Sequence, residues 1–249
     1  MDRIGIIITA GGSGKRMGSQ LPKQFIEVGG TPILIRTLQK LSDIPNSELV
    51  LVLPKEWISY WQELCQQHNC TIVHKVIEGG NERFHSVRNG IEALEEVDYI
   101  AIHDGVRPFV DTDIFERVFQ AAKSTGAALP AIKPVDSMRE ISKSGDNKIA
   151  DRNRYVLVQT PQIFRSEVIR RAYEQPFSTQ FTDDASVVEA NGHKITLVEG
   201  ARQNIKITTE EDLQLAEFII TRQPKLNARR QLLNKLKNNE KTFNIHNKR

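Results

Sequence analysis

The chain has 249 residues, 39% of them hydrophobic, which suits one large α/β domain with a full core. No apolar run approaches the ~20 residues of a membrane-spanning helix, and the first residues show no signal-peptide pattern, so we expect a cytoplasmic protein. Two cysteines, Cys65 and Cys70, are too few for a disulfide framework or a four-cysteine metal site.

The charge is unevenly distributed along the chain. Residues 222–249 contain nine Lys or Arg residues and one Glu, a surplus of eight positive charges, although the whole chain has a net charge of +3. The preceding residues therefore have a net charge of −5, which argues against a nucleic-acid-binding body. We expect a single domain over residues 1–222 and a basic, solvated C-terminal tail over residues 223–249.

The first apolar segment, Ile4–Thr9, is typical of a strand that is buried on both faces of a parallel sheet. Strand-like and helical patterns then alternate. The predicted strands are Glu48–Leu53, Cys70–Ile77, Asp98–His103 and Gly126–Ile132, and the predicted helices are Pro32–Leu41, Glu56–Gln67, Phe84–Glu95 and Asp111–Ser124. We expect Asp111 to cap the last of these helices and Gly126 to end it. The alternation predicts a mostly parallel sheet with helices on both faces, whose ligand binds in the loops after the strands.

The pattern changes between residues 134 and 162. Two extended segments flank a turn at Gly145-Asp146, which indicates a hairpin arm. Because a hairpin has too little core to be stable alone, we expect this arm to pack on a second subunit. The remaining predicted elements are the helices Ser166–Tyr173, Thr182–Ala190 and Thr208–Thr221 and the strand His193–Val198.

The loop after the first strand has the residues of an anion site. Its run Gly11-Gly12-Ser13-Gly14 lets successive N–H groups converge, and the nearby cations Lys15, Arg16 and Lys23 suit a polyphosphate. The spacing is not that of a P-loop, because Thr9 stands where Gly is required, nor that of the dinucleotide fingerprint, because Met17 takes the last Gly position. A tight strand-to-helix turn with solvated charges is the alternative.

Four further polar clusters follow along the chain. The segment 78–83 with Ser86 is suited to hold a base edge, or is an ordinary turn and helix cap. In the segment 103–108, Asp104 is suited to bind Mg²⁺ and Arg107 a phosphate, unless His103 and Asp104 form a structural pair. The other two clusters, each unspecific alone, are Asp151–Asn153 with Gln159–Gln162 and Thr182–Ala185 with Asn204–Thr208.

In this order, the five clusters together resemble the 2-C-methyl-D-erythritol 4-phosphate cytidylyltransferases of the non-mevalonate route to isoprenoid precursors. The matching stretches are AGGSGKRMGSQLPKQF, EGGNERFHSV, HDGVRP, DRNRYVLVQTPQ, TDDASVVE and NIKITTEEDL. They extend to about Leu213, so the tail lies outside the resemblance. The glycine loop and HDGVRP are shared with other sugar and polyol nucleotidyltransferases, whereas DRN…QTPQ with TDDA narrows the choice to this family.

The resemblance implies a Rossmann-like α/β nucleotidyltransferase fold, a homodimer joined through the hairpin arm, and Mg²⁺-dependent transfer of CMP from CTP to a sugar-alcohol phosphate. It implies that Arg16 and Lys23 are catalytic residues that contact the triphosphate. It also implies catalytic roles at the acceptor for Lys206 and for Arg152, which the partner subunit would contribute. Asp104 would hold Mg²⁺. The implied nucleotide-binding residues are Ala10, Gly11, Gly12, Gly80, Asn81, Ser86, Asp104, Gly105 and Arg107, and the implied acceptor-binding residues are Ser137, Arg152, Thr160, Thr182 and Lys206.

Three positions depart from the family's usual pattern without removing a catalytic group. Ser137 stands where Thr is usual, Asn81 where Asp is often found, and Gly105 where Ala is common. A sister enzyme that makes CDP-ribitol from ribitol 5-phosphate remains an alternative, although DRNRYVLVQTPQ counts against it. A silent nucleotide-sensing module is a second alternative, but it would have no need of Lys23, Asp104 and Arg107 together.

Overall fold

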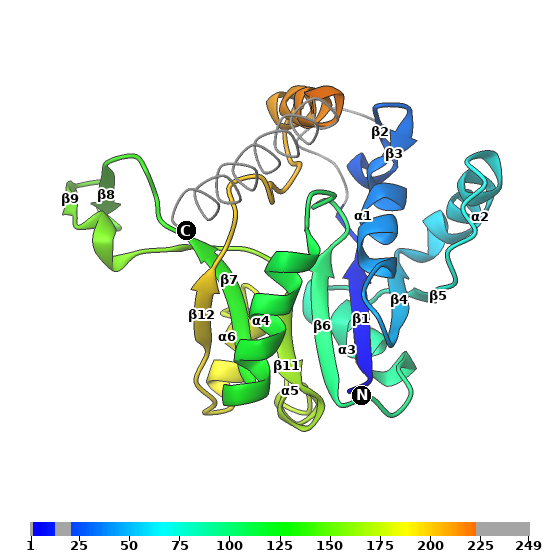
Figure 1. Ribbon diagram of the computed structural model, residues 1–249. Coiled ribbons are helices and arrows are strands. Elements are labelled where there is room, and N and C mark those ends of the chain that lie inside the picture. The colour runs from blue at the N-terminus through cyan, green and yellow to red at the C-terminus, as the bar shows by residue number, and fades with distance from the viewer. Residues whose placement is uncertain (1, 13–20, 223–249) are drawn as a thin grey trace, which may run out of the picture.

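The computed structural model describes residues 2–12 and 21–222, and its central feature is an eight-stranded twisted sheet (Figure 1). Four neighbouring strands of this sheet are parallel, in the order β6-β1-β4-β5. Their bounds are Ile4–Thr9 (β1), Ser47–Leu53 (β4), Lys75–Glu78 (β5) and Tyr99–Asp104 (β6). All four carboxyl ends therefore meet at one edge of the sheet, as the sequence predicted.

The other half of the sheet is mixed in direction. Its strands are β7 (Ala127–Ile132), β10 (Leu157–Val158), β11 (Gln162–Arg165) and β12 (Thr196–Glu199). Strand β11 lies between β6 and β7 and is antiparallel to both, while β12 is parallel to β7. The prediction of a mostly parallel sheet is confirmed, with β10 and β11 as its antiparallel members.

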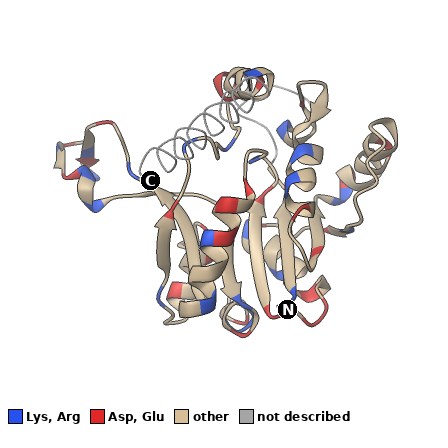
Figure 2. Cartoon of the chain, viewed as in Figure 1, with Lys and Arg blue, Asp and Glu red and all other residues tan. Residues whose placement is uncertain are grey.

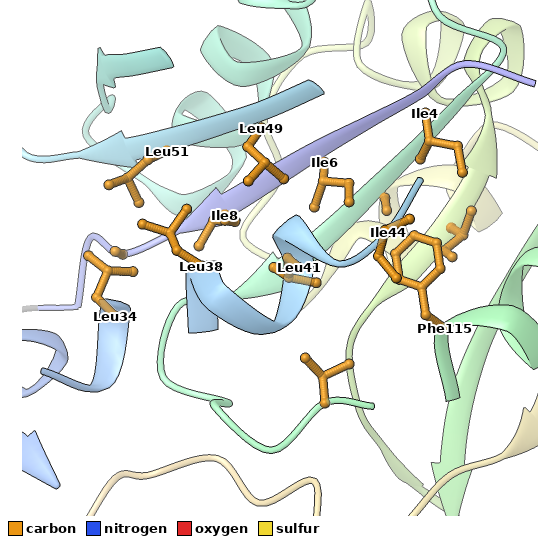
Figure 3. Close-up of a cluster of buried hydrophobic side chains, with 14 of the residues drawn as sticks. Ile4, Ile6, Ile8, Leu34, Leu38, Leu41, Ile44, Leu49, Leu51 and Phe115 are labelled. Atoms are coloured by element: carbon orange, nitrogen blue, oxygen red, sulfur yellow. The ribbon is translucent and has the colours of Figure 1, made fainter. Parts of the chain in front are cut away.

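Helices cover both faces of the sheet because side chains alternate along each strand. Ile6 and Ile8 of β1 belong to a core shared with one set of helices (Figure 3). Ile7 belongs to a second core on the opposite face. The first set is α1 (Ile33–Ser42), α2 (Ile58–Gln67) and α4 (Thr112–Thr125). The second set is α3 (Arg83–Ala93), α5 (Ser166–Ala172) and α6 (Asp184–Ala190).

The ends of α4 confirm two predictions from local chemistry. The Asp111 carboxylate accepts a hydrogen bond from the N–H of Ile114, so Asp111 caps the helix. Gly126 ends it with a φ of 90°, a left-handed conformation that favours glycine.

The strand predicted over Cys70–Ile77 is wrong in its first half, since β5 begins only at Lys75. The reason is a side-chain contact with α2. The indole N–H of Trp61 donates to Nε2 of His74 over 3.1 Å. His74 therefore turns toward α2, and the segment before it leaves the edge of the sheet, with Val73 fully in solvent.

The hairpin arm is confirmed, but it is shorter than predicted. Its strands are β8 (Met138–Ile141) and β9 (Asn147–Ala150), and the connecting turn contains Gly145 at a φ of 89°. The chain after Arg154 returns to the central sheet, because Ile163 and Phe164 are fully buried there. The arm projects from the side of the sheet in Figure 1.

The remaining described elements are short or lie at the end of the domain. They are the small hairpin β2 (Glu27–Val28) and β3 (Thr31–Pro32), three 3-10 turns at Lys23–Phe25, Lys55–Trp57 and Arg152–Arg154, and a helix over residues 210–222. The Asp212 carboxylate caps this last helix by accepting from the N–H groups of Thr208 and Thr209. The predicted tail, residues 223–249, lies outside the described residues.

Charged residues of both signs cover the helices and loops, whereas most of the central strands carry none (Figure 2). Of the helices in the described part of the chain, none combines the length and hydropathy needed to cross a bilayer.

Candidate active site

A hollow of about 440 Å³ opens at the carboxyl ends of the four parallel strands. The ends of these strands and the segments that follow them form most of its wall: residues 9–12 at the end of β1, 52–54 at the end of β4, 79–83 after β5, and Asp104 at the end of β6. Lys23, Gln24, Ser86, Val106 and Lys206 complete the lining. A larger groove of about 720 Å³ lies near the opposite ends of the strands, but it contains none of the predicted site residues.

Two glycines let the loop after β5 pass directly against the first turn of α3. A Cβ atom on Gly80 would lie 2.3 Å from Cβ of His85, and one on Gly79 would lie 2.9 Å from Oγ of Ser86. The N–H of Gly80 instead donates to Ser86 Oγ over 3.1 Å. Ser86 therefore holds the loop in place, and the absence of side chains at both glycines allows the loop backbone to pack closely on α3.

Asp104 is a buried carboxylate among cations. Its Oδ2 lies 3.2 Å from Nζ of Lys206 and 3.0 Å from Nε of Arg107. Burial alone would raise the pKa of Asp104, but the positive charges of Lys206 and Arg107, with a further contribution from Arg83, outweigh burial and lower this pKa well below its ordinary value. Asp104 is therefore ionised at neutral pH.

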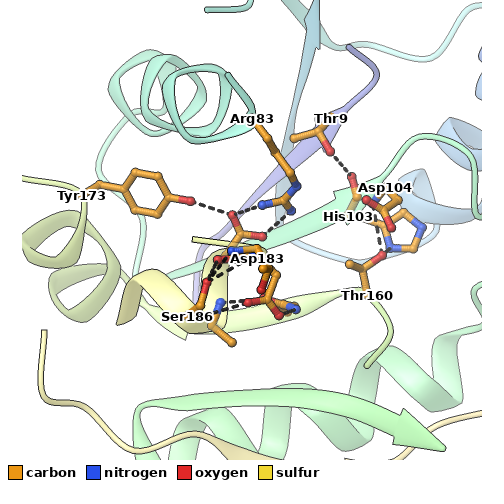
Figure 4. Close-up of polar contacts among 12 residues, drawn as sticks. Thr9, Arg83, His103, Asp104, Thr160, Tyr173, Asp183 and Ser186 are labelled. Atoms are coloured by element: carbon orange, nitrogen blue, oxygen red, sulfur yellow. Dashed lines mark hydrogen bonds and ion pairs between the residues drawn. The ribbon is translucent and has the colours of Figure 1, made fainter. Parts of the chain in front are cut away.

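The neighbouring His103 is structural. Burial lowers its pKa to about 4, so the imidazole is neutral at pH 7. Its Nε2 faces the carbonyl oxygen of Arg107 at 3.1 Å and must carry the proton, because a carbonyl only accepts. Nδ1 then accepts from the hydroxyl of Thr160, which itself accepts from the N–H of Asp104 (Figure 4). His103 and Thr160 thus fix the backbone at Asp104.

The donor set at the hollow fits Mg²⁺ in one way. In the described part of the chain, no group of three or more His, Cys, Asp or Glu residues could hold a metal by itself. Mg²⁺, however, is commonly bound by one or two carboxylates together with substrate phosphates and water. Both cations near Asp104 contact its Oδ2. The ionised carboxylate is therefore able to offer Oδ1 to a metal that also binds phosphate.

The structure brings most of the predicted nucleotide-binding and catalytic residues together. Those that line the hollow are Ala10, Gly11, Gly12, Lys23, Gly80, Asn81, Ser86, Asp104 and Lys206. Gly105 and Arg107 are buried behind it. There the carbonyl oxygen of Gly105 accepts from the Thr37 hydroxyl, and Arg107 donates to the carbonyl oxygen of Asn204. Arg16 lies outside the described residues.

The predicted acceptor-binding residues are more scattered. Ser137 and Arg152 lie on the arm, where they line a separate hollow of about 370 Å³. Thr160 is buried and makes the hydrogen bonds to His103 and Asp104 described above. Thr182 is exposed, directly before the start of α6. Within one chain, Lys206 is the predicted acceptor residue that lines the main hollow.

Two residues of the hollow were not singled out from the sequence. The Gln24 side chain donates to the carbonyl oxygen of Ala10 over 2.6 Å and so anchors the start of the glycine loop. Arg83 lines the hollow and forms an ion pair with Asp184. Both residues lie within the motifs that carry the family resemblance. Arg83 could have been found from the sequence, because it is a cation at a helix start that follows a loop with two glycines.

A mostly parallel sheet covered by helices, with a glycine loop and an ionised aspartate at its carboxyl edge, defines an α/β protein of the nucleotidyltransferase type. Two solved structures share this fold. One is the 4-diphosphocytidyl-2C-methyl-D-erythritol synthase from Anaerococcus prevotii, with a TM-score of 0.76 and 30% identity over 89% of this chain and 97% of that one. The other is the 2-C-methyl-D-erythritol 4-phosphate cytidylyltransferase from Thermus thermophilus, with a TM-score of 0.71 and 30% identity. This match covers 87% of this chain and 98% of that one.

The family model described as "IspD: 2-C-methyl-D-erythritol 4-phosphate cytidylyltransferase" matches residues 4–222. A protein of that name from Bacteroides fragilis is 47% identical over 215 residues, which cover 86% of this chain and 98% of the relative. One from Porphyromonas gingivalis is 44% identical over 216 residues, which cover 86% of this chain and 96% of the relative. The chain belongs to the 2-C-methyl-D-erythritol 4-phosphate cytidylyltransferase family, and the resemblance seen in its motifs is confirmed.

The neutral state of His103 predicts a pH dependence of folding. The unfolded chain binds a proton on this residue below its ordinary pKa of 6.5, whereas the folded protein does so only near pH 4. The free energy of unfolding should therefore fall as the pH drops from 6.5 to 4, by about 3 kcal/mol from this group. Urea titrations in metal-free buffer should show a weaker pH slope for His103→Gln than for the unmodified chain. Equal slopes in this window would contradict the prediction.

Proposed function

We propose that this protein transfers CMP from CTP to 2-C-methyl-D-erythritol 4-phosphate. The products are pyrophosphate and 4-diphosphocytidyl-2-C-methyl-D-erythritol, an intermediate of the non-mevalonate route to isoprenoid precursors. The observation that carries the proposal is the meeting of Lys23, Arg83, Lys206 and ionised Asp104 in one hollow at the carboxyl edge of the sheet. Membership of the family supports the choice of substrates.

The reaction joins two phosphates, and it requires no covalent enzyme intermediate. An oxygen of the acceptor phosphate attacks the α-phosphorus of CTP, and the bond from that phosphorus to the bridging oxygen breaks, so pyrophosphate leaves with the electron pair. Both partners are anions, so the protein's main task is to hold them together against their repulsion. Preorganised positive charge performs this task and stabilises the transition state.

Two cations of the hollow, Lys23 and Lys206, have a place in this scheme. Lys23 lies beside the glycine loop and would contact the triphosphate, together with Arg16 by the family resemblance. Lys206 contacts Asp104 and would orient the acceptor phosphate. Mg²⁺, held by Asp104 when bound, would neutralise phosphate charge. The loop at Gly80 and Asn81, held by Ser86, would contact the cytosine ring through backbone groups.

We also propose that two copies of the chain form a homodimer through the hairpin arm. The arm exposes Ile141 and Ile149, which are 73% and 79% accessible, although it is too thin to bury them itself. Arg152 and Ser137 lie on this arm, away from the hollow of their own chain. When a partner subunit covers the arm, Arg152 and Ser137 would lie at the hollow of that partner and not at the hollow of their own chain. This supports the role in the acceptor site that the resemblance gives to Arg152.

The domain boundaries and cellular location remain part of the proposal. The family model ends at residue 222, which supports a division into a domain over 1–222 and a tail over 223–249. The absence of nucleic-acid and membrane partners and the location in the cytoplasm remain predictions from the sequence.

The acceptor is tested by a competition in one tube. With CTP, Mg²⁺ and equal 2-C-methyl-D-erythritol 4-phosphate and ribitol 5-phosphate, the first should be used at least about 10²-fold faster, because unmatched polar groups of the site penalise the analogue. Mass spectrometry of the two products gives the ratio. A pool dominated by CDP-ribitol would overturn the substrate but keep the chemistry. Nucleotide binding without pyrophosphate release from either acceptor would instead favour a sensing module.

The place of Arg152 is tested by mixing two inactive variants. Lys23→Ala damages the hollow of its own chain, and Arg152→Ala damages the site to which its arm reaches. In a heterodimer of the two, both defects fall on one site if Arg152 acts across the interface, which leaves the other site intact.

After subunit exchange, up to one quarter of the wild-type rate per subunit should therefore return. The control is a mixture of Arg139→Ala and Lys23→Ala. Arg139 is another arginine of the arm, and Arg139→Ala by itself should remain active. Properly exchanged heterodimers without recovered activity would show that Arg152 acts within its own chain, or has no catalytic role.

A further inference from the structure

Arg83 and Asp184 form a partly buried, two-pronged ion pair at the wall of the hollow. The guanidinium donates from Nη1 to Oδ1 over 2.7 Å and from Nη2 to Oδ2 over 2.5 Å (Figure 4). Asp184 is completely buried, and its Oδ1 also accepts from the hydroxyl of Tyr173 over 2.7 Å. Arg83 is half-buried and lines the hollow. Arginine is suited to this contact because its planar fork matches a carboxylate.

This ion pair joins two segments that are 101 residues apart in the chain. Arg83 is the first residue of α3 and directly follows the loop with Gly80 and Asn81, on the nucleotide side. Asp184 is the first residue of α6 and directly follows Thr182 and Asp183, on the acceptor side. The contact therefore sets the separation of the two halves of the proposed site.

The two segments depend on the ion pair to different degrees. The Gly80 loop has its own supports, because it continues from β5 and its N–H is held by Ser86. Helix α6 has seven residues, and Asp184 itself forms part of its start. Side chains from outside the helix hold this start through Gln162 and through the contacts of Asp184 with Tyr173 and Arg83. Loosening the ion pair should therefore displace Thr182 more than the nucleotide loop.

We propose that Arg83 is a positioning residue that holds the acceptor-binding segment 182–184 in register with the nucleotide loop. This role rests on the proposed function, since it concerns the acceptor of that reaction. Transfer between two bound phosphates requires close alignment, and small displacements are costly. The buried carboxylate of Asp184 also requires a cation beside it, so the pair is not free to separate in the folded protein.

Steady-state kinetics of three variants test the proposal. Arg83→Lys keeps the positive charge but loses the fork, and Asp184→Asn keeps the shape but loses the negative charge. Each should raise the KM for the acceptor about tenfold or more, with less than a threefold change in the KM for CTP. The double variant should be no worse than the worse single variant, because the two residues act as a unit. Arg88→Lys, an exposed change on the same helix, is the matched control.

Two kinetic results would overturn the proposal. If Arg83→Lys alters the KM for CTP or kcat while Asp184→Asn has no effect, Arg83 binds the nucleotide directly. If both variants lose activity only in proportion to their folded fraction, with both KM values unchanged, the pair is merely structural. Circular dichroism and urea unfolding measure that fraction.

Amide hydrogen exchange provides a readout that needs no turnover. In Arg83→Lys, exchange should become faster at residues 182–186 and stay unchanged at residues 79–81. Unchanged exchange at 182–186 would overturn the proposal even if the enzyme is active. If the unmodified chain makes no product from CTP and 2-C-methyl-D-erythritol 4-phosphate, the proposed function fails, and the exchange result still decides whether Arg83 positions this segment.

Discussion

The charge on Asp104 is the feature on which the rest of the site depends. Strand β6 pairs in parallel with β1, so Asp104 lies beside Thr9, where the glycine loop begins. Its buried charge requires cations, and Lys206 supplies one of them from the far end of the domain. The same segment is fixed by the N–H of Ile207, which donates to the carbonyl oxygen of Val106 over 3.0 Å. This segment is therefore held against the end of β6 by a backbone hydrogen bond as well as by the ion pair.

The sequence was a good guide wherever local periodicity or local chemistry decides the structure. The apolar run of β1, the cap at Asp111 and the stop at Gly126 depend on near neighbours, and all three were predicted correctly. The position of the hollow followed as well, because polar loops after parallel strands must converge at one edge. Asp104 and Lys23 could be named for this reason before the structure was known.

Contacts between distant segments were the part that the sequence could not supply. Nothing local to His74 shows that it bonds Trp61, which is why the start of β5 was misplaced. Strand β11 lies between β6 and β7, which are parallel to each other. This placement depends on the burial of Phe164 against parts of the chain that are distant in sequence. The Arg83–Asp184 pair likewise joins two motifs that, read separately, look like ordinary helix starts.

The most direct test of this account is the rate of pyrophosphate release by Asp104→Asn over a range of Mg²⁺ concentrations. Asp98→Asn, which alters the aspartate directly before the same strand, is the control. Asp104→Asn should remain folded, lose at least about 10²-fold in rate and no longer respond to Mg²⁺ as the unmodified chain does. A folded Asp104→Asn protein with the wild-type rate and Mg²⁺ response would contradict it.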